Sequence, residues 1–185
     1  MFIVINRHRM ARHMAKMNNL INGFLNVSLF ESGKIFIHKR EFDMGSLIRE
    51  MIEETSLIAT THTIKFSESG PVLVLADRDK IGSVISNLLG NAVKYSPAGN
   101  PIEVTCSRDN YEVIVRVKDQ GIGINPKDIE KIFDRFYRVE ASNSRHISGF
   151  GIGLYLSAEI IKGHGGRIWA VSESSQGSTF SFSLP

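Results

Sequence analysis

The most regular hydrophobic pattern in the chain lies between a helix-start signal at residues 77–80 and Pro97. Apolar residues recur there at spacings of three and four, which predicts a helix with one buried stripe. Its members are Ile81, Val84, Ile85, Leu88, Leu89, Ala92 and Val93. Four polar residues share a different face because they fall at i, i+4, i+7 and i+8. They are Asn87, Asn91, Lys94 and Tyr95.

The polar face of this helix has two interpretations. Amide oxygens can ligate magnesium, and a lysine can meet phosphate oxygens as a point charge. Glu and Lys are the better helix formers for a surface that only meets water, so two asparagines on one line favour a metal–polyphosphate site. A solvated face with two chance asparagines remains the alternative.

The remaining periodicity predicts an α/β chain. It predicts an amphipathic helix over residues 7–30 and a second helix with an apolar face that begins at Asp43. Alternating or short apolar runs predict strands at 34–41, 63–67, 72–75, 102–107, 111–119, 167–172 and 178–184. Asn125 caps a short helix that has Pro126 at its first position, and a last helix runs from the glycines near residue 150 to about residue 162.

The amphipathic helix at residues 7–30 needs a partner for its apolar stripe. Met10, Met14, Met17, Ile21 and Phe24 alternate at spacings of four and three. The stripe must pack on the following domain, on a missing partner helix or on a second chain.

Composition narrows the function classes. The chain has 185 residues, 42% of them hydrophobic, which suits one ordinary domain with an appendage. The net charge is +3 and its basic residues are scattered, so nucleic-acid binding is not indicated. The lone Cys106 suits a reducing compartment, and no apolar run is long enough for a signal or a membrane span. We therefore expect a soluble, cytoplasmic chain whose parent protein can still carry membrane spans.

Two glycine-rich stretches carry candidate chemistry. Asp119 ends an apolar strand and is followed by Gly121 and Gly123, so a flat ligand can approach the backbone while the carboxylate accepts from an exocyclic amine such as that of adenine. An ordinary turn is the alternative. Residues 149–153 place three glycines at a helix start, which suits an anion, and the polar residues before them suggest a lid.

The order of these motifs is more specific than any of them alone. Within residues 87–154 the chain runs through Asn-x-x-x-Asn, Lys-Tyr, Asp-x-Gly-x-Gly, Phe-x-x-Phe-Tyr-Arg and Gly-x-Gly-x-Gly-Leu. This resembles the catalytic ATP-binding domain of bacterial sensor histidine kinases, within the GHKL superfamily. The resemblance covers the chain from about residue 34 onward. It implies a two-layer α/β sandwich, a mixed sheet backed by helices, here preceded by one long amphipathic helix.

The resemblance also implies ATP and Mg²⁺ as ligands and assigns roles to the first motifs. Asn91 would ligate magnesium and Asn87 would help hold the metal–phosphate group. Lys94 would contact phosphate, and Tyr95 would pack near the nucleotide. Asp119 matches the adenine-binding aspartate of the first glycine box, with Gly121 and Gly123 beside it.

The later motifs match two further boxes of the family. The F box corresponds to Phe133, Phe136, Tyr137 and Arg138. The second glycine box corresponds to Gly149, Gly151, Gly153 and Leu154. Arg138 would reach the γ-phosphate, so the catalytic set is Asn87, Lys94 and Arg138. Phe150 departs from the small or hydroxyl residue usual at its position, which puts a hydroxyl contact to phosphate in doubt.

Residues 1–33 resemble the second helix of the family's dimerisation and phosphoacceptor hairpin, and residues 34–185 the catalytic domain. The phosphorylatable histidine would lie on a first helix that the sequence lacks, because neither His8 nor His13 has the acceptor's context. The implied partners are that acceptor helix, a response regulator receiver domain and a second copy of the parent kinase. A non-catalytic nucleotide-binding module is the alternative. Hydrolysis is disfavoured because the superfamily's hydrolases carry Glu where Asn87 stands, and an amide cannot take a proton from water.

Overall fold

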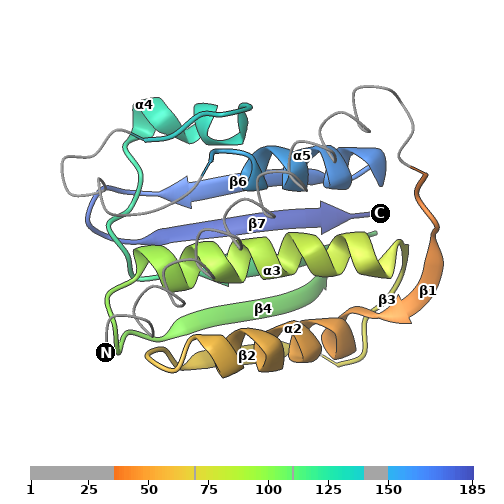
Figure 1. The fold of residues 1–185 in the computed structure, drawn as a ribbon. Coiled ribbons are helices and arrows are strands. Elements are labelled where there is room, and N and C mark those ends of the chain that lie inside the picture. The colour runs from red at the N-terminus through yellow and green to blue at the C-terminus, as the bar shows by residue number, and fades with distance from the viewer. Residues whose placement is uncertain (1–35, 69, 110, 140–149) are drawn as a thin grey trace, which may run out of the picture. The chain divides into compact units, whose positions relative to one another are not determined.

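A five-stranded mixed sheet carries helices on one face (Figure 1). Its strands are, in spatial order, β2 (Ile64–Glu68), β4 (Ile102–Asp109), β5 (Glu112–Lys118), β7 (Ser178–Leu184) and β6 (Arg167–Ser172). The pair β2–β4 is parallel, and every other neighbouring pair is antiparallel. The predicted two-layer arrangement of mixed sheet and helices is therefore confirmed.

The helical layer consists of α2 (Met44–Ile58), α3 (Arg78–Tyr95) and α5 (Gly153–Gly163). Two smaller elements, α4 (Pro126–Ile129) and the 3-10 helix η1 (Lys131–Phe133), follow β5. A separate two-stranded sheet pairs β1 (Arg40–Asp43) with β3 (Leu73–Ala76). It lies at the end of the sandwich where α2 and α3 begin (Figure 1).

This computed structural model describes residues 36–68, 70–109, 111–139 and 150–185. Ile37–Pro185 form a compact unit. The helix predicted over residues 7–30, the candidate lid and Gly149 lie outside the described ranges.

The core lies between the sheet and the helices. Cross-strand neighbours place Val104, Val117, Phe180 and Ala170 in one row on the helix-facing side. Leu88 and Leu89 of α3 and Ile161 of α5 meet this side and are fully buried. The alternation of the strands and the three-and-four spacing of α3 thus bury the same core from opposite sides.

The helix starts follow from their caps. Asp43 accepts the Ser46 N–H at 2.9 Å at the start of α2, and Asp77 accepts the Lys80 N–H at 3.2 Å at the start of α3. Asn125 accepts the Lys127 N–H at 3.2 Å with Pro126 in the first turn of α4. Each cap satisfies an N–H that the helix itself leaves unpaired. All three starts agree with the sequence prediction.

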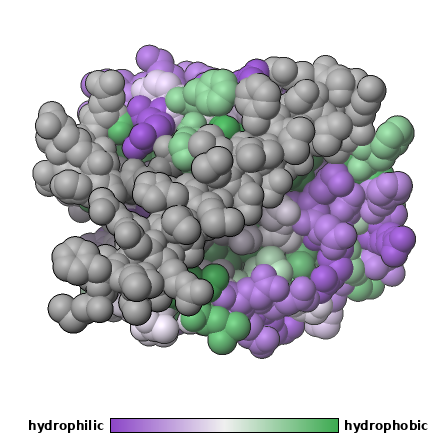
Figure 2. All heavy atoms as spheres, viewed as in Figure 1, coloured by the Kyte–Doolittle hydropathy of each residue, from purple (hydrophilic) through white to green (hydrophobic). Residues whose placement is uncertain are grey.

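The helices are polar on the side that faces away from the sheet. Figure 2 shows hydrophilic side chains gathered at the end of this face where β1 and the first turns of α2 lie. On α2, Ser46, Arg49 and Glu50 are exposed, whereas Leu47 and Ile48 are buried. Among the described residues, no helix combines the length and apolarity needed to cross a membrane.

The predicted strand at residues 34–41 is wrong in its extent. In the structure β1 begins only at Arg40, and Phe36 to Lys39 make no sheet ladder. Instead, the His38 N–H donates to the Asp77 carboxylate at 3.0 Å and Lys39 donates to the His164 carbonyl at 3.3 Å. Contacts with the ends of two helices hold this segment in place. The alternation of apolar and polar residues along the sequence does not reveal such contacts.

Candidate functional site

The polar face of α3 keeps the predicted residues together. Asn87, Asn91 and Lys94 are all half-buried, whereas Ser83 and Ser86 on the outer face are exposed. The Lys94 ammonium lies 3.1 Å from the Tyr95 hydroxyl and 4.7 Å from the centre of its ring. This contact directs the lysine side chain toward Tyr95 at the C-terminal end of α3.

The Asn87 amide is fixed by α5. Ser157 Oγ donates to the Gly153 carbonyl at 3.0 Å and therefore accepts from Asn87 Nδ2, also at 3.0 Å. Asn87 Nδ2 therefore points to Ser157, and Oδ1 is the acceptor atom that the amide can offer to a ligand. A Cβ on Gly153 would overlap Asn87 Oδ1, so a side chain there would push the amide aside. Asn87 and the second glycine box are thus in direct contact.

Ser157 was missed by the sequence reasoning. It lies four residues after Gly153, so both face Asn87 from the first turn of α5, and that spacing is the signal that could have found it. The hydroxyl is buried, with 2% of the residue exposed. It therefore orients Asn87 rather than meeting solvent.

If Asn87 contacts Mg-ATP, as the resemblance implies, Ser157→Ala should weaken that binding about fivefold, because Asn87 loses the hydrogen bond that orients its amide. Ser86→Ala, an exposed change on the outer face of α3, serves as control and should leave affinity unchanged. Isothermal titration calorimetry measures both. Equal affinities of the wild type and Ser157→Ala would show that Asn87 needs no such support.

Asp119 lies just beyond β5 and is almost fully buried, with 4% of its surface exposed. Its N–H donates to the Ser178 carbonyl at 2.8 Å, and its Oδ1 accepts the Gly121 N–H at 2.7 Å. Burial raises the pKa of the Asp119 carboxyl, and the hydrogen bonds that the carboxylate accepts from the backbone of Gly121 and Ser178 only partly oppose that rise. A buried carboxylate is a strong acceptor for an N–H donor of a ligand.

The first glycine box touches the end of α3. A Cβ on Gly121 would lie 2.5 Å from the Tyr95 carbonyl oxygen and 2.7 Å from Asp119 Oδ1. The loop can therefore reach α3 only with glycine at this position. This contact places Asp119 beside the C-terminal end of the helix that carries Asn87 and Asn91.

The β6–β7 hairpin holds the loop from its other side. The Ser175 N–H donates to the Ile122 carbonyl at 2.8 Å, and the Ile124 N–H donates to Ser172 Oγ at 2.8 Å. A Cβ on Gly123, whose φ is +68°, would overlap the Glu173 carbonyl oxygen. The sequence predicts the two strands of this hairpin but not that they shape the loop after Asp119.

The F box lies against the second glycine box. The Phe136 N–H donates to the Gly151 carbonyl at 2.9 Å, and Phe136 has a φ of +64°, rare for a residue with a side chain. The Tyr137 hydroxyl donates to Asp128 Oδ1 at 2.7 Å, which anchors the segment to α4. Arg138 and Phe150 are exposed, and Leu154 packs on the core.

Most of the predicted motifs contact one another in the structure. Gly153 meets Asn87, Gly121 meets the end of α3, and Gly151 meets Phe136. The described residues do not include Gly149, so its place remains a prediction. Arg138 lies at the far end of the F box, and its approach to phosphate is likewise a prediction.

The donor set fits a nucleotide-bound magnesium better than a metal site made by protein alone. Among the described residues no three His, Cys, Asp or Glu side chains come together as a metal cage. The Asn87 and Asn91 amides offer hard oxygen ligands, and magnesium commonly takes few protein ligands and completes its shell with phosphate and water.

A groove of about 500 Å³ also lies between α2 and α3. Leu47, Met51 and Gly82 line its apolar part, and Glu50 and Glu54 are among its charged residues. Of the predicted site residues it touches only Asn87. The groove is therefore distinct from the contacts around Asp119 and Gly121.

Comparison with known proteins identifies the family. Residues 76–185 match the family described as histidine kinase-, DNA gyrase B- and HSP90-like ATPases. The chain belongs to this family. It is 35% identical over 175 residues to the sensor histidine kinase WalK of Bacillus subtilis, covering 92% of this chain and 28% of WalK. It thus spans less than a third of that relative.

Solved structures of family members share the fold. The structure of full-length ShkA in complex with AMPPNP matches 92% of this chain and 36% of ShkA, at 26% identity and a TM-score of 0.82. The catalytic domain of histidine kinase ThkA matches 80% of this chain and 95% of its own length, at 30% identity and a TM-score of 0.68. The family member described here therefore corresponds to the catalytic-domain part of a sensor histidine kinase.

Proposed function

We propose that this family member binds Mg-ATP and transfers the γ-phosphoryl group to a histidine on a helix outside the chain. The observation that carries the proposal is the Asn87 amide, oriented by Ser157 beside the second glycine box. An amide can hold a metal–phosphate group but cannot act as the base that hydrolysis needs. The buried Asp119 adds the acceptor for an adenine amine, and a bound AMPPNP in ShkA supports an adenine nucleotide as ligand.

Each residue has a separate task in this proposal. Asp119 and Gly121 select and seat adenine, whereas Asn91 and Asn87 hold magnesium through their amide oxygens. Lys94 neutralises phosphate charge, and Arg138 approaches the γ-phosphate during transfer. Mg²⁺, when bound, supplies charge neutralisation across the phosphates. The protein contributes positioning and electrostatic stabilisation, the main sources of rate in phosphoryl transfer.

The other assignments rest on the family. We assign residues 1–33 to the second helix of a dimerisation and phosphoacceptor hairpin and residues 34–185 to the catalytic domain. The acceptor helix, a response regulator receiver domain and a second parent chain are the proposed partners, and the cytoplasm is the proposed location. A non-catalytic nucleotide-binding module is the second candidate, favoured only if nucleotide binds and transfer fails.

Transfer in trans decides between these candidates. The chain is incubated with γ-labelled Mg-ATP, alone and with an acceptor-hairpin protein from a related kinase. We expect an acid-labile, base-stable phosphoprotein only when the acceptor is present. The Asn87→Asp variant tests whether transfer needs the amide. Labelling of the chain alone would contradict the assignment of an external acceptor. Binding without any transfer would favour the non-catalytic module.

Asn91→Ala tests the magnesium assignment. We expect the affinity for ATP to fall about tenfold in magnesium and to change little in EDTA, because only a metal ligand acts through the ion. Ser86→Ala, which is exposed on the same helix, is the control. Calorimetry in both buffers measures the effect, and equal losses with and without metal would exclude Asn91 as a ligand.

A further inference from the structure

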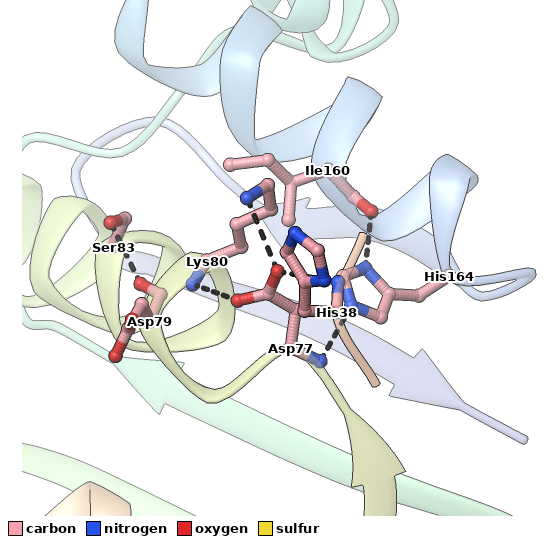
Figure 3. Close-up of polar contacts among 7 residues, drawn as sticks. All are labelled: His38, Asp77, Asp79, Lys80, Ser83, Ile160 and His164. Carbon is pink, nitrogen blue, oxygen red and sulfur yellow. Dashed lines mark hydrogen bonds and ion pairs between the residues drawn. The ribbon is translucent and has the colours of Figure 1, made fainter. Parts of the chain in front are cut away.

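A second polar cluster lies away from the nucleotide residues, where α5 ends and α3 begins. His164 forms the end of α5 and is 2% exposed, and Asp77 forms the cap of α3 and is 5% exposed. Figure 3 shows the imidazole between the Ile160 carbonyl and the Asp77 backbone. The proposed ATP chemistry uses neither side chain, so their burial needs another explanation.

The hydrogen bonds define the state of the ring. His164 Nδ1 lies 2.8 Å from the Ile160 carbonyl, which can only accept, so Nδ1 carries the proton. His164 Nε2 lies 3.0 Å from the Asp77 N–H, which can only donate, so Nε2 is an unprotonated acceptor. The neutral imidazole therefore bridges the last turn of α5 and the residue that starts α3.

The Asp77 carboxylate extends this bridge to the incoming chain. One oxygen accepts the Lys80 N–H at 3.2 Å inside α3, and the other accepts the His38 N–H at 3.0 Å. The Lys80 ammonium lies 3.1 Å from the second oxygen. Burial opposes the charge of Asp77, but the His38 and Lys80 hydrogen bonds and the Lys80 ion pair outweigh it and hold the pKa of that carboxyl below its ordinary value.

Residues 37–39 also contact the C-terminal end of α5. The Lys39 ammonium donates to the His164 carbonyl at 3.3 Å. A Cβ on Gly163 would lie 2.7 Å from Ile37 Cδ1, so the isoleucine packs directly on the helix end. The compact unit begins at Ile37. The first three residues of the unit therefore contact both helices that form the proposed phosphate side of the site.

The helices α3 and α5 are joined at two separated points. His164 meets Asp77 at one point, and Ser157 meets Asn87 at the other. Ten residues of helix, about 15 Å, separate Asp77 from Asn87. These two hydrogen bonds add to the packing of α5 against α3 and bind the helices at both ends of that contact. Loss of the histidine bridge would therefore loosen one end of the contact, and α3 would transmit that change to the Asn87 amide.

We infer that His164 is a positioning residue for the nucleotide site, and that residues 37–39 are the tether through which the preceding chain acts on nucleotide affinity. The inference deepens the proposed Mg-ATP binding and rests on it. Tension on the tether weakens the Asp77 cap and loosens the start of α3, so Asn87 is held less well. Release of that tension restores the Asp77 cap and the position of Asn87.

Two substitutions of His164 separate its two hydrogen bonds. His164→Asn keeps a donor near Nδ1 and removes the Nε2 acceptor, whereas His164→Gln keeps an acceptor near Nε2. We expect Mg-ATP affinity to fall about fivefold in His164→Asn and to stay within about twofold of wild type in His164→Gln. Hydrogen exchange at Lys80 and Ile81 should accelerate only in His164→Asn.

The tether is tested by His38→Pro, which removes the N–H that binds Asp77, against His38→Ala, which keeps it. We expect His38→Pro to weaken Mg-ATP binding about threefold and to accelerate exchange in the first turn of α3, and His38→Ala to do neither. Unchanged affinity and exchange in both His38→Pro and His164→Asn would overturn the inference. If the wild type fails to bind Mg-ATP, the proposed function falls, while the exchange data still decide the positioning claim.

The bridge also predicts a pH effect that a merely structural residue would not transmit to the site. Burial lowers the pKa of His164 below its ordinary value, aided by Lys39 and Lys80 and opposed by the Ile160 hydrogen bond and Asp77. Stability from the neutral ring is present above pH of about 6.5 and is lost as the pH falls toward the folded pKa, because the exposed ring of the unfolded chain takes up a proton there. At the folded pKa the bridging Nε2 is itself protonated, and the Asp77 N–H loses its acceptor. Mg-ATP affinity should therefore fall more steeply with acid in the wild type than in His164→Gln. Parallel profiles would contradict the bridge.

Discussion

Asp119→Asn is expected to weaken Mg-ATP binding about 100-fold without destabilising the fold. The Asn amide keeps an oxygen for the Gly121 N–H but turns an NH₂ group toward the adenine amine. The charge-assisted hydrogen bond from the adenine amine is lost, because two donors then face each other. Burial raises the pKa of Asp119, so its ionised form opposes folding at neutral pH. The variant should therefore unfold at the same temperature as the wild type or above it.

Asp109→Asn is the matched control, because Asp109 is an exposed carboxylate at the end of β4. Calorimetry with ATP and thermal unfolding give the two readouts. Loss of affinity with retained stability supports Asp119 as the adenine acceptor. Unchanged affinity would place adenine elsewhere, and a large drop in stability would give Asp119 a structural role instead.

Gly177→Ala is expected to lower the free energy of unfolding by about 3 kcal/mol. Gly177 has a φ of +83°, and a Cβ there would overlap the Asp119 carbonyl oxygen and lie 2.9 Å from Gln120 Cα. Both obstacles are backbone atoms, which cannot rotate aside. The hairpin would move away from the loop, and Mg-ATP affinity would fall with it.

Gly99→Ala separates strain from overlap. Gly99 has a φ of +90°, but no atom lies within 4 Å of its added Cβ. Backbone strain alone should lower its stability by about 1 kcal/mol. Urea unfolding of both variants measures the difference. Equal losses would mean that the hairpin does not hold the Asp119 loop through this contact.

The fold could be predicted where local chemistry decides it. Asp43, Asp77 and Asn125 each cap a helix as the sequence indicates, and the last two strands have the predicted bounds. Those signals lie within a few residues of the element they define. Residues 34–41 mislead because their partners, Asp77 and His164, are distant in sequence, and a strand pattern carries no record of them.

The site could be predicted as a set of motifs but not as a geometry. The order of the motifs indicated the nucleotide-binding residues, yet no local pattern joins Asn87 to Ser157, which are 70 residues apart. In the sequence Gly177 looks like an ordinary turn glycine, and only the structure shows that it packs against the Asp119 backbone. His164 reads as part of a helix break, although it forms a buried bridge between two helices. Supporting contacts of this kind depend on tertiary packing alone.

An NMR titration of the chain with Mg-ATP tests the central claim most directly, because it reports which backbone amides meet the nucleotide. We predict saturable shifts centred on Asn87, Asn91, Gly121 and Gly153, with small changes at Asp109. Shifts centred instead on Glu50 and Glu54 in the groove between α2 and α3, or no saturable shift at all, would contradict a nucleotide site built from the Asn87 face of α3 and the Asp119 loop.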